Sequence, residues 1–190
     1  THMTTALELL KTLPDTRERA QQELRLRLAL GVPLRSTKGA SSPEVGATYT
    51  RTRELCQQVG DTHQLFPPLF GLWTFHQMRG EFLTARELGE QLLGLAQREQ
   101  DPALLMEAYR ALGGTLFRLG EFSAAQTHLE QSLTLHDAQR HHSHAFLYSM
   151  EPGVMSLCYA AGVLWHLGYP DQALQKSKAA RALAQELSHP

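Results

Sequence analysis

Isoleucine and asparagine are absent from this sequence of 190 residues, and valine occurs only five times. By contrast, the sequence contains 33 leucines and 21 alanines. Strands favour β-branched residues, whereas helices favour Leu, Ala, Gln, Glu and Arg. The composition therefore predicts an all-helical protein.

Cysteine is also scarce, because only Cys56 and Cys158 are present and they lie far apart within helical patterns. A secreted chain held by disulfides would carry more cysteines at closer spacings. We expect both side chains to be reduced and buried in the core. The lack of asparagine removes N-glycosylation acceptors as well. Both features favour a cytoplasmic location.

No apolar run reaches the roughly 18 residues that a transmembrane helix needs. No secretory leader opens the chain, and Thr1, His2 and Met3 resemble an expression scar. The formal net charge is −1, which argues against a nucleic-acid binder whose affinity comes mainly from phosphate contacts. We therefore expect neither a membrane nor a nucleic acid as a partner.

Catalytic spacings are missing too. There is no phosphate-binding loop with Lys-Ser/Thr, no Cys-x-x-Cys and no His-Glu-x-x-His. Gly113 and Gly114 lie between Leu112 and Leu116 of an apolar helical stripe. Close helix packing explains this glycine pair better than a phosphate loop, which needs a preceding strand. We therefore expect no enzymatic activity and no cofactor.

Histidines cluster in one segment, at His136, His141, His142 and His144. Imidazoles at such spacing, with Asp137 beside them, could ligate Zn²⁺ or Ni²⁺. Short histidine runs on an exposed loop are more often solvated polar sequence. We predict no metal site, and metal binding by these four histidines is the alternative.

The sequence repeats itself with a period near forty residues. A turn glycine precedes a small residue by five positions at Gly80 and Ala85, Gly120 and Ala125, and Gly168 and Ala173, with Val45 in a degenerate first copy. These anchors are separated by 40, 40 and 48 residues (45 to 85, 85 to 125, 125 to 173). The eight extra residues of the last interval fall within 137–153. Periodicity of this kind is the signature of stacked supersecondary units.

Each unit has two amphipathic helical stripes separated by a tight turn. We predict an N-terminal helix within residues 4–14, followed by an array over 15–190 with units at about 15–61, 62–101, 102–152 and 153–190. The helices expected in the array are 16–30 (interrupted near 31–33), 43–59, 63–79, 82–99, 102–119, 122–136, 153–167 and 170–187.

The third unit resembles a tetratricopeptide (TPR) repeat, in which an aromatic residue, a Leu-Gly pair, a turn glycine and an alanine follow in fixed order. Its matching residues are Tyr109, Leu112, Gly113, Gly120 and Ala125. The second unit departs from the pattern with Leu72-Trp73 at the Leu-Gly pair, and the fourth departs with Ala160-Ala161. The resemblance implies a right-handed α-solenoid of about four helix-turn-helix pairs. Its long period resembles the C-terminal arrays of bacterial STAND-type signalling ATPases and of cyclase-ATPase fusion proteins.

In that family the first helix of each pair lines a concave binding face. Mapped onto this sequence, the face comprises Phe70, Thr74, Gln77, Arg110, Gly114, Phe117, Arg118, Trp165 and His166, with Cys158 and Gly162 at equivalent positions. Arg110 and Arg118 are expected to share one side of their helix and to suit a carboxylate or an acidic peptide. Phe117 and Trp165 either supply apolar contact area to a partner or pack in the core between helices.

The function implied is that of a non-catalytic interaction module in a larger bacterial signalling protein, whose other domains include an ATPase or a nucleotide cyclase. Its partner is a protein, a peptide, an effector or another domain of the parent chain. The alternative is a structural spacer or a self-association module. The chain stops at Pro190 without a polar capping helix, and an uncapped last repeat would favour a homodimer.

Overall fold

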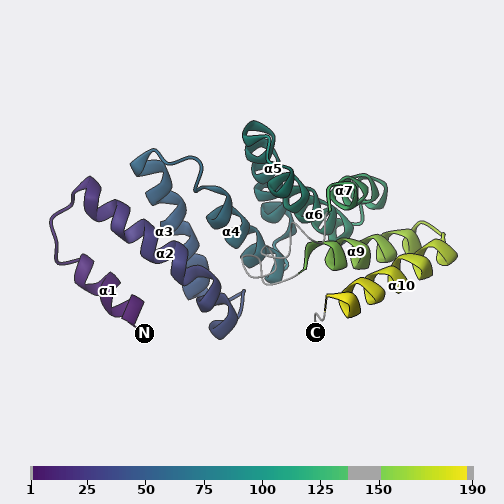
Figure 1. Cartoon of the computed structure of the whole chain (residues 1–190), viewed down its shortest axis with the longest axis horizontal. Coiled ribbons are helices and arrows are strands. Elements are labelled where there is room, and N and C mark those ends of the chain that lie inside the picture. The colour runs from purple at the N-terminus through teal and green to yellow at the C-terminus, as the bar shows by residue number, and fades with distance from the viewer. Residues whose placement is uncertain (1, 137–150, 188–190) are drawn as a thin grey trace. The chain divides into compact units, whose positions relative to one another are not determined.

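The computed structural model describes residues 2–136 and 151–187, and within these ranges the chain is helical without any strand (Figure 1). The helices before residue 81 are α1 (His2–Leu10), α2 (Arg17–Lys38), α3 (Pro43–Val59) and α4 (Phe66–Met78). Those after it are α5 (Phe82–Glu99), α6 (Pro102–Leu119), α7 (Phe122–Leu135), α9 (Pro152–His166) and α10 (Pro170–Glu186). The expected all-helical fold is confirmed.

Prolines and glycines mark helix ends as the sequence predicts. Pro43, Pro102 and Pro170 each lie in the first turn of a helix, where the missing N–H needs no helical acceptor. Gly120 ends α6 with φ 79°, a left-handed conformation that glycine adopts without steric cost. Its N–H donates to the Phe117 carbonyl oxygen at 3.1 Å. These local signals account for the close agreement of most helix boundaries.

The predicted interruption near residues 31–33 is wrong, because α2 continues through Pro33 to Lys38. A proline inside a helix removes one backbone hydrogen bond. Packing against α3 offsets this cost, since the Tyr49 ring lies directly over Gly31 and the Arg35 side chain is buried. A Cβ atom on Gly31 would meet Tyr49 Cε1 at only 2.7 Å.

The chain forms two compact units, Thr1–Glu81 and Phe82–Pro190. In unit 1, α1 packs on α2, α2 on α3 and α3 on α4, and α2 also contacts α4. In unit 2, α5 packs on α6, α6 on α7, α7 on α9 and α9 on α10, and α6 also contacts α9. Neighbouring helices in the chain are therefore neighbours in space within each unit. The division falls inside the repeat predicted at 62–101, so the limits of that repeat stay a prediction.

The repeat anchors are core residues, as all four of Val45, Ala85, Ala125 and Ala173 are buried. Their small size lets two helices approach closely. One core cluster of unit 1 contains Ala20, Leu24, Leu55, Cys56 and Val59. One core cluster of unit 2 contains Leu116, Ala125, Leu129, Ala160 and Val163. Among the described helices, none combines the length and apolarity that crossing a bilayer requires.

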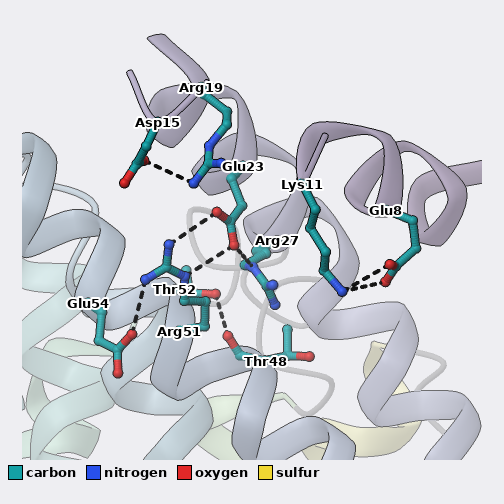
Figure 2. Close-up of polar contacts among 10 residues, drawn as sticks. All are labelled: Glu8, Lys11, Asp15, Arg19, Glu23, Arg27, Thr48, Arg51, Thr52 and Glu54. Atoms are coloured by element: carbon teal, nitrogen blue, oxygen red, sulfur yellow. Dashed lines mark hydrogen bonds and ion pairs between the residues drawn. The ribbon is translucent and has the colours of Figure 1, made fainter. Parts of the chain in front are cut away.

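Ion pairs join α2 to α3 beside the apolar core of unit 1 (Figure 2). The Glu23 carboxylate accepts hydrogen bonds from Arg27 Nε at 2.7 Å and from Arg51 Nε and Nη2, each at 3.2 Å. Arg51 Nη1 also donates to Glu54 Oε2 at 3.3 Å. One carboxylate thus contacts two guanidinium groups from two helices.

Candidate interaction surface on helices α6 and α9

An aromatic cluster lies where α6, the start of α7 and α9 meet in unit 2. Its members, named here the Phe117 cluster, are Phe117, Phe122, Tyr159 and His166. The Phe117 ring centroid lies 6.0 Å from those of Phe122 and Tyr159 and 5.6 Å from that of His166. The His166 ring stacks on Phe122 at 4.7 Å. Aromatic pairs at such separations stabilise a fold beyond the area that they bury.

Two glycines allow α6 and α9 to approach closely. A Cβ on Gly114 of α6 would lie 3.0 Å from Tyr159 Cε2, and a Cβ on Gly162 of α9 would lie 3.0 Å from Phe117 Cζ. Each helix therefore places an aromatic ring over a glycine of the other. This packing supports the interpretation of Gly114 as a close-contact residue.

Side chains with free hydrogen-bonding or apolar surface flank this cluster. Trp165 is 65% exposed and Tyr169 is 51% exposed. Arg118 is exposed, and in the described part of the chain its guanidinium makes no hydrogen bond or ion pair. His166 is exposed while its Nδ1 lies 2.8 Å from the Gly162 carbonyl oxygen. An indole on α9, a phenol at the start of α10 and a cation on α6 are thus exposed to solvent.

Four residues expected on the concave face lie in the interior instead: Phe70, Gln77, Arg110 and Gly114. Arg110 is only 3% exposed, and its Nη2 lies 2.7 Å from Oε2 of the fully buried Glu107. The expectation that Arg110 and Arg118 share a side of α6 is wrong. Eight residues correspond to a rotation of about 80° beyond two turns, which here separates a buried position from an exposed one.

The three expected residues of α4 belong to unit 1. The Phe70 ring is buried 5.1 Å from the ring of Trp73, which is buried as well. Thr74 is half-buried, and its hydroxyl donates to the Phe70 carbonyl oxygen at 2.9 Å. The structure therefore accommodates the bulky Trp73 of the second repeat within the core, and Phe70 serves packing.

Phe117 and Trp165 have different environments, although they occupy equivalent repeat positions. Phe117 is half-buried in its cluster, so the core interpretation holds for it. Trp165 projects into solvent, so the core interpretation does not hold there. Tyr169 was not expected at this surface. Tyr169 follows the turn glycine Gly168, at the position where two other units carry Glu81 and Glu121. An aromatic residue in place of an acidic one is the sequence signal that could have indicated an exposed binding residue here.

The expectation that both cysteines are buried is right for Cys56 and wrong for Cys158. Cys56 is buried, whereas Cys158 of α9 is exposed, and both are free thiols. Burial raises the pKa of the Cys158 thiol, so at neutral pH this group is protonated and a weak nucleophile.

Metal-binding geometry is not present among residues 2–136 and 151–187, where no group of three His, Cys, Asp or Glu side chains could hold an ion. His141, His142 and His144 lie outside the described residues. His136 is described, and its Nε2 lies 2.7 Å from Glu151 Oε1.

Comparison with protein-family models yields no match for this chain, and comparison with curated proteins yields none either. The TPR resemblance therefore rests on the residues of the repeat alone.

Proposed function

We propose that this chain is a non-catalytic, TPR-like helical-repeat module that binds a protein or peptide through unit 2. The observation that carries the proposal is the 65% exposure of Trp165 on α9. Tryptophan is highly buried on average, and it is among the residues most enriched at binding hot spots. The pairing of each helix with its chain neighbour, and of α6 with α9, supports a solenoid arrangement.

The chemistry of the partner follows from the exposed side chains. Trp165 and Tyr169 offer flat apolar area with a polar edge, and Arg118 offers an unpaired guanidinium. A peptide segment with apolar side chains and a nearby carboxylate would complement these groups. On this proposal the binding residues are Arg118, Trp165 and His166 together with Tyr169.

The wider setting is proposed from the resemblance alone. We place the module in the cytoplasm, within a larger bacterial signalling protein that carries an ATPase or a nucleotide cyclase. In that setting the partner is either a separate protein or another domain of the parent chain.

A phage-displayed peptide library panned on the full chain tests the binding function. Selected peptides should bind the parent protein, and Trp165→Ala combined with Arg118→Ala should weaken binding about tenfold or more. The matched control is Leu83→Ala with Arg98→Ala, which alters exposed side chains of α5 and should leave binding unchanged. Equal losses in both double variants, or no enrichment of any peptide, would refute the proposal.

Self-association is the second candidate, and the exposure of Leu174 on α10, in addition to that of Trp165 and Tyr169, favours it. Sedimentation velocity over a roughly hundredfold concentration range would detect a homodimer. If the parent protein dimerises and Trp165→Ala remains monomeric, the surface serves self-association. If both remain monomeric, the surface is available to another partner.

A further inference from the structure

A groove lies between α1 and α2 of unit 1, remote in sequence from the surface proposed above. Its volume is about 580 Å³, and its walls are mainly leucine and alanine side chains. The residues that matter for its chemistry are Ala6, Leu9, Leu10, Leu13, Arg25 and Leu26.

The groove is open along its length. Leu9 is 63% exposed and Leu13 is 49% exposed, although both belong to its walls. A small-molecule site generally encloses most of its ligand, which this shape does not do. An open apolar trough between two helices instead matches the way an amphipathic helix is bound, through side chains at i, i+3 and i+4.

The charge of the groove indicates which kind of helix it would bind. Arg25 is the single charged residue that lines the groove. In the described part of the chain Arg25 makes no hydrogen bond or ion pair. Other charges nearby in the sequence do form ion pairs: Lys11 with Glu8 at 2.7 Å, Arg19 with Asp15 at 2.9 Å, and Arg27 with Glu23 at 2.7 Å (Figure 2). Within residues 2–136 and 151–187, Arg25 is therefore an exposed cation that forms no ion pair, at the edge of an apolar surface.

The surroundings of Arg25 strengthen this preference for an anion. Arg25 also lines a polar pocket of about 400 Å³ between α2 and α3, together with Arg17 and His63. Asp61 is the acidic residue of that pocket, and its carboxylate accepts from Gln64 Nε2 at 2.6 Å. With two arginines and one carboxylate, the lining of this pocket carries a net positive charge, and the Arg17 guanidinium donates to the Val59 carbonyl oxygen at 3.1 Å.

We propose that the α1–α2 groove docks an acidic amphipathic helix of a partner protein. Leucine-type side chains of that helix lie against Leu9, Leu13 and Leu26, and an Asp or Glu next to its apolar stripe pairs with Arg25. This second surface does not depend on the function proposed for unit 2. Complementary charge then sets the orientation of the helix and excludes basic helices.

Two fluorescein-labelled helical peptides of about 14 residues test the proposal. Both carry the same Leu/Ala stripe, and their polar positions are all Glu in one and all Lys in the other. Fluorescence anisotropy with the full chain should show the Glu peptide binding about tenfold more tightly at low salt. Arg25→Glu should reverse this preference, and Leu13→Ser should weaken binding of both peptides.

The matched controls lie on the other unit. Arg98→Glu and Leu83→Ala, at exposed sites of α5, should leave the affinities of both peptides unchanged, because neither residue borders the groove. Circular dichroism should show Arg25→Glu and Leu13→Ser folded, since both side chains are largely solvent-exposed. Equal affinity for the two peptides, or an unchanged preference in Arg25→Glu, would overturn the proposal. A parent chain that dimerises, with Leu13→Ser monomeric, would overturn it too, by making a second copy the occupant.

Discussion

His136 Nε2 lies 2.7 Å from Glu151 Oε1, which joins the end of α7 to the start of α9. The other carboxylate oxygen of Glu151 accepts a hydrogen bond from the Val154 backbone N–H and thereby caps α9. The His136 ring also lies over Gly153, where a Cβ would meet its Nε2 at 2.6 Å. One side chain therefore both caps a helix and holds it against another.

This contact should make stability depend on pH in a defined direction. Burial alone would raise the pKa of the Glu151 carboxyl, but the hydrogen bonds from His136 and from the Val154 N–H outweigh it and leave the pKa below its usual value. A carboxyl whose pKa is lowered on folding stabilises the native state above its unfolded pKa. That stabilisation is lost as the pH falls through the folded pKa.

Glu151→Gln should lower the free energy of unfolding by about 1–2 kcal/mol at pH 7. The difference from the parent should shrink as the pH falls below 4.5, the ordinary pKa of a glutamate, because the parent carboxylate becomes protonated only below it. Urea unfolding monitored by circular dichroism at each pH measures this. Glu130→Gln, at an exposed site of α7, is the control and should change stability little. A difference that stays constant across this pH range would contradict the assignment.

Two glycines of unit 2 should respond to alanine in opposite ways. A Cβ on Gly113 would meet Leu129 Cγ at 2.6 Å, and Leu129 is fully buried, whereas a Cβ on Gly94 would meet nothing within 4 Å. Gly94→Ala should therefore stabilise the protein by up to about 1 kcal/mol through helix propensity. Gly113→Ala should destabilise it by about 1–3 kcal/mol through overpacking. The unfolding temperatures of the two variants test this. Similar changes in unfolding temperature for both would mean that α6 and α7 pack less closely than described.

The Glu23 network predicts an unequal response from two glutamates that contact the same arginine. The Glu23 side chain is 13% exposed and that of Glu54 is 56% exposed. Glu23→Gln leaves Arg27 and Arg51 without their shared counter-charge and should cost about 2 kcal/mol. Glu54→Gln should cost less than about 0.5 kcal/mol, because an exposed ion pair contributes little. Urea midpoints measured for both variants test this, and equal midpoints would rule out a dominant role for Glu23.

Cysteine labelling should distinguish the two thiols. Burial, with a smaller effect of the Asp61 charge, raises the pKa of Cys56 to about 11, and the side chain is fully buried. At neutral pH a maleimide should therefore modify the exposed Cys158 first, as mass spectrometry of tryptic peptides would show. Cys56 should react only when α2 and α3 separate, so its labelling rate in urea reports the opening of unit 1. Equal rates for both thiols in the native protein would contradict the burial of Cys56.

Helix positions could be predicted well because their determinants are local. Pro43 and Pro102 start helices, Gly120 ends one, and the small anchors Val45 and Ala125 are buried as their spacing indicates. Pro33 is the exception. Its local tendency to stop a helix is outweighed by the contact of Tyr49 with Gly31, and that contact joins residues from different helices.

The candidate site could be predicted only in part. Successive side chains of a helix differ in direction by about 100°, so an error of one residue in register can move a side chain from the surface to the core. Arg118 and Trp165 are exposed, whereas Arg110 is buried, and the role of the two exposed residues in binding stays a prediction. Whether a side chain of α6 is exposed depends on which helices pack against α6. The periodicity of the α6 sequence does not specify those neighbours. Composition and spacing thus establish helices, turns and core anchors, because each depends on residues close in the chain. The packing of one helix on another decides which of the equivalent positions Phe117 and Trp165 is covered, and it leaves Arg25 without an ion pair in the part of the chain that the structure describes.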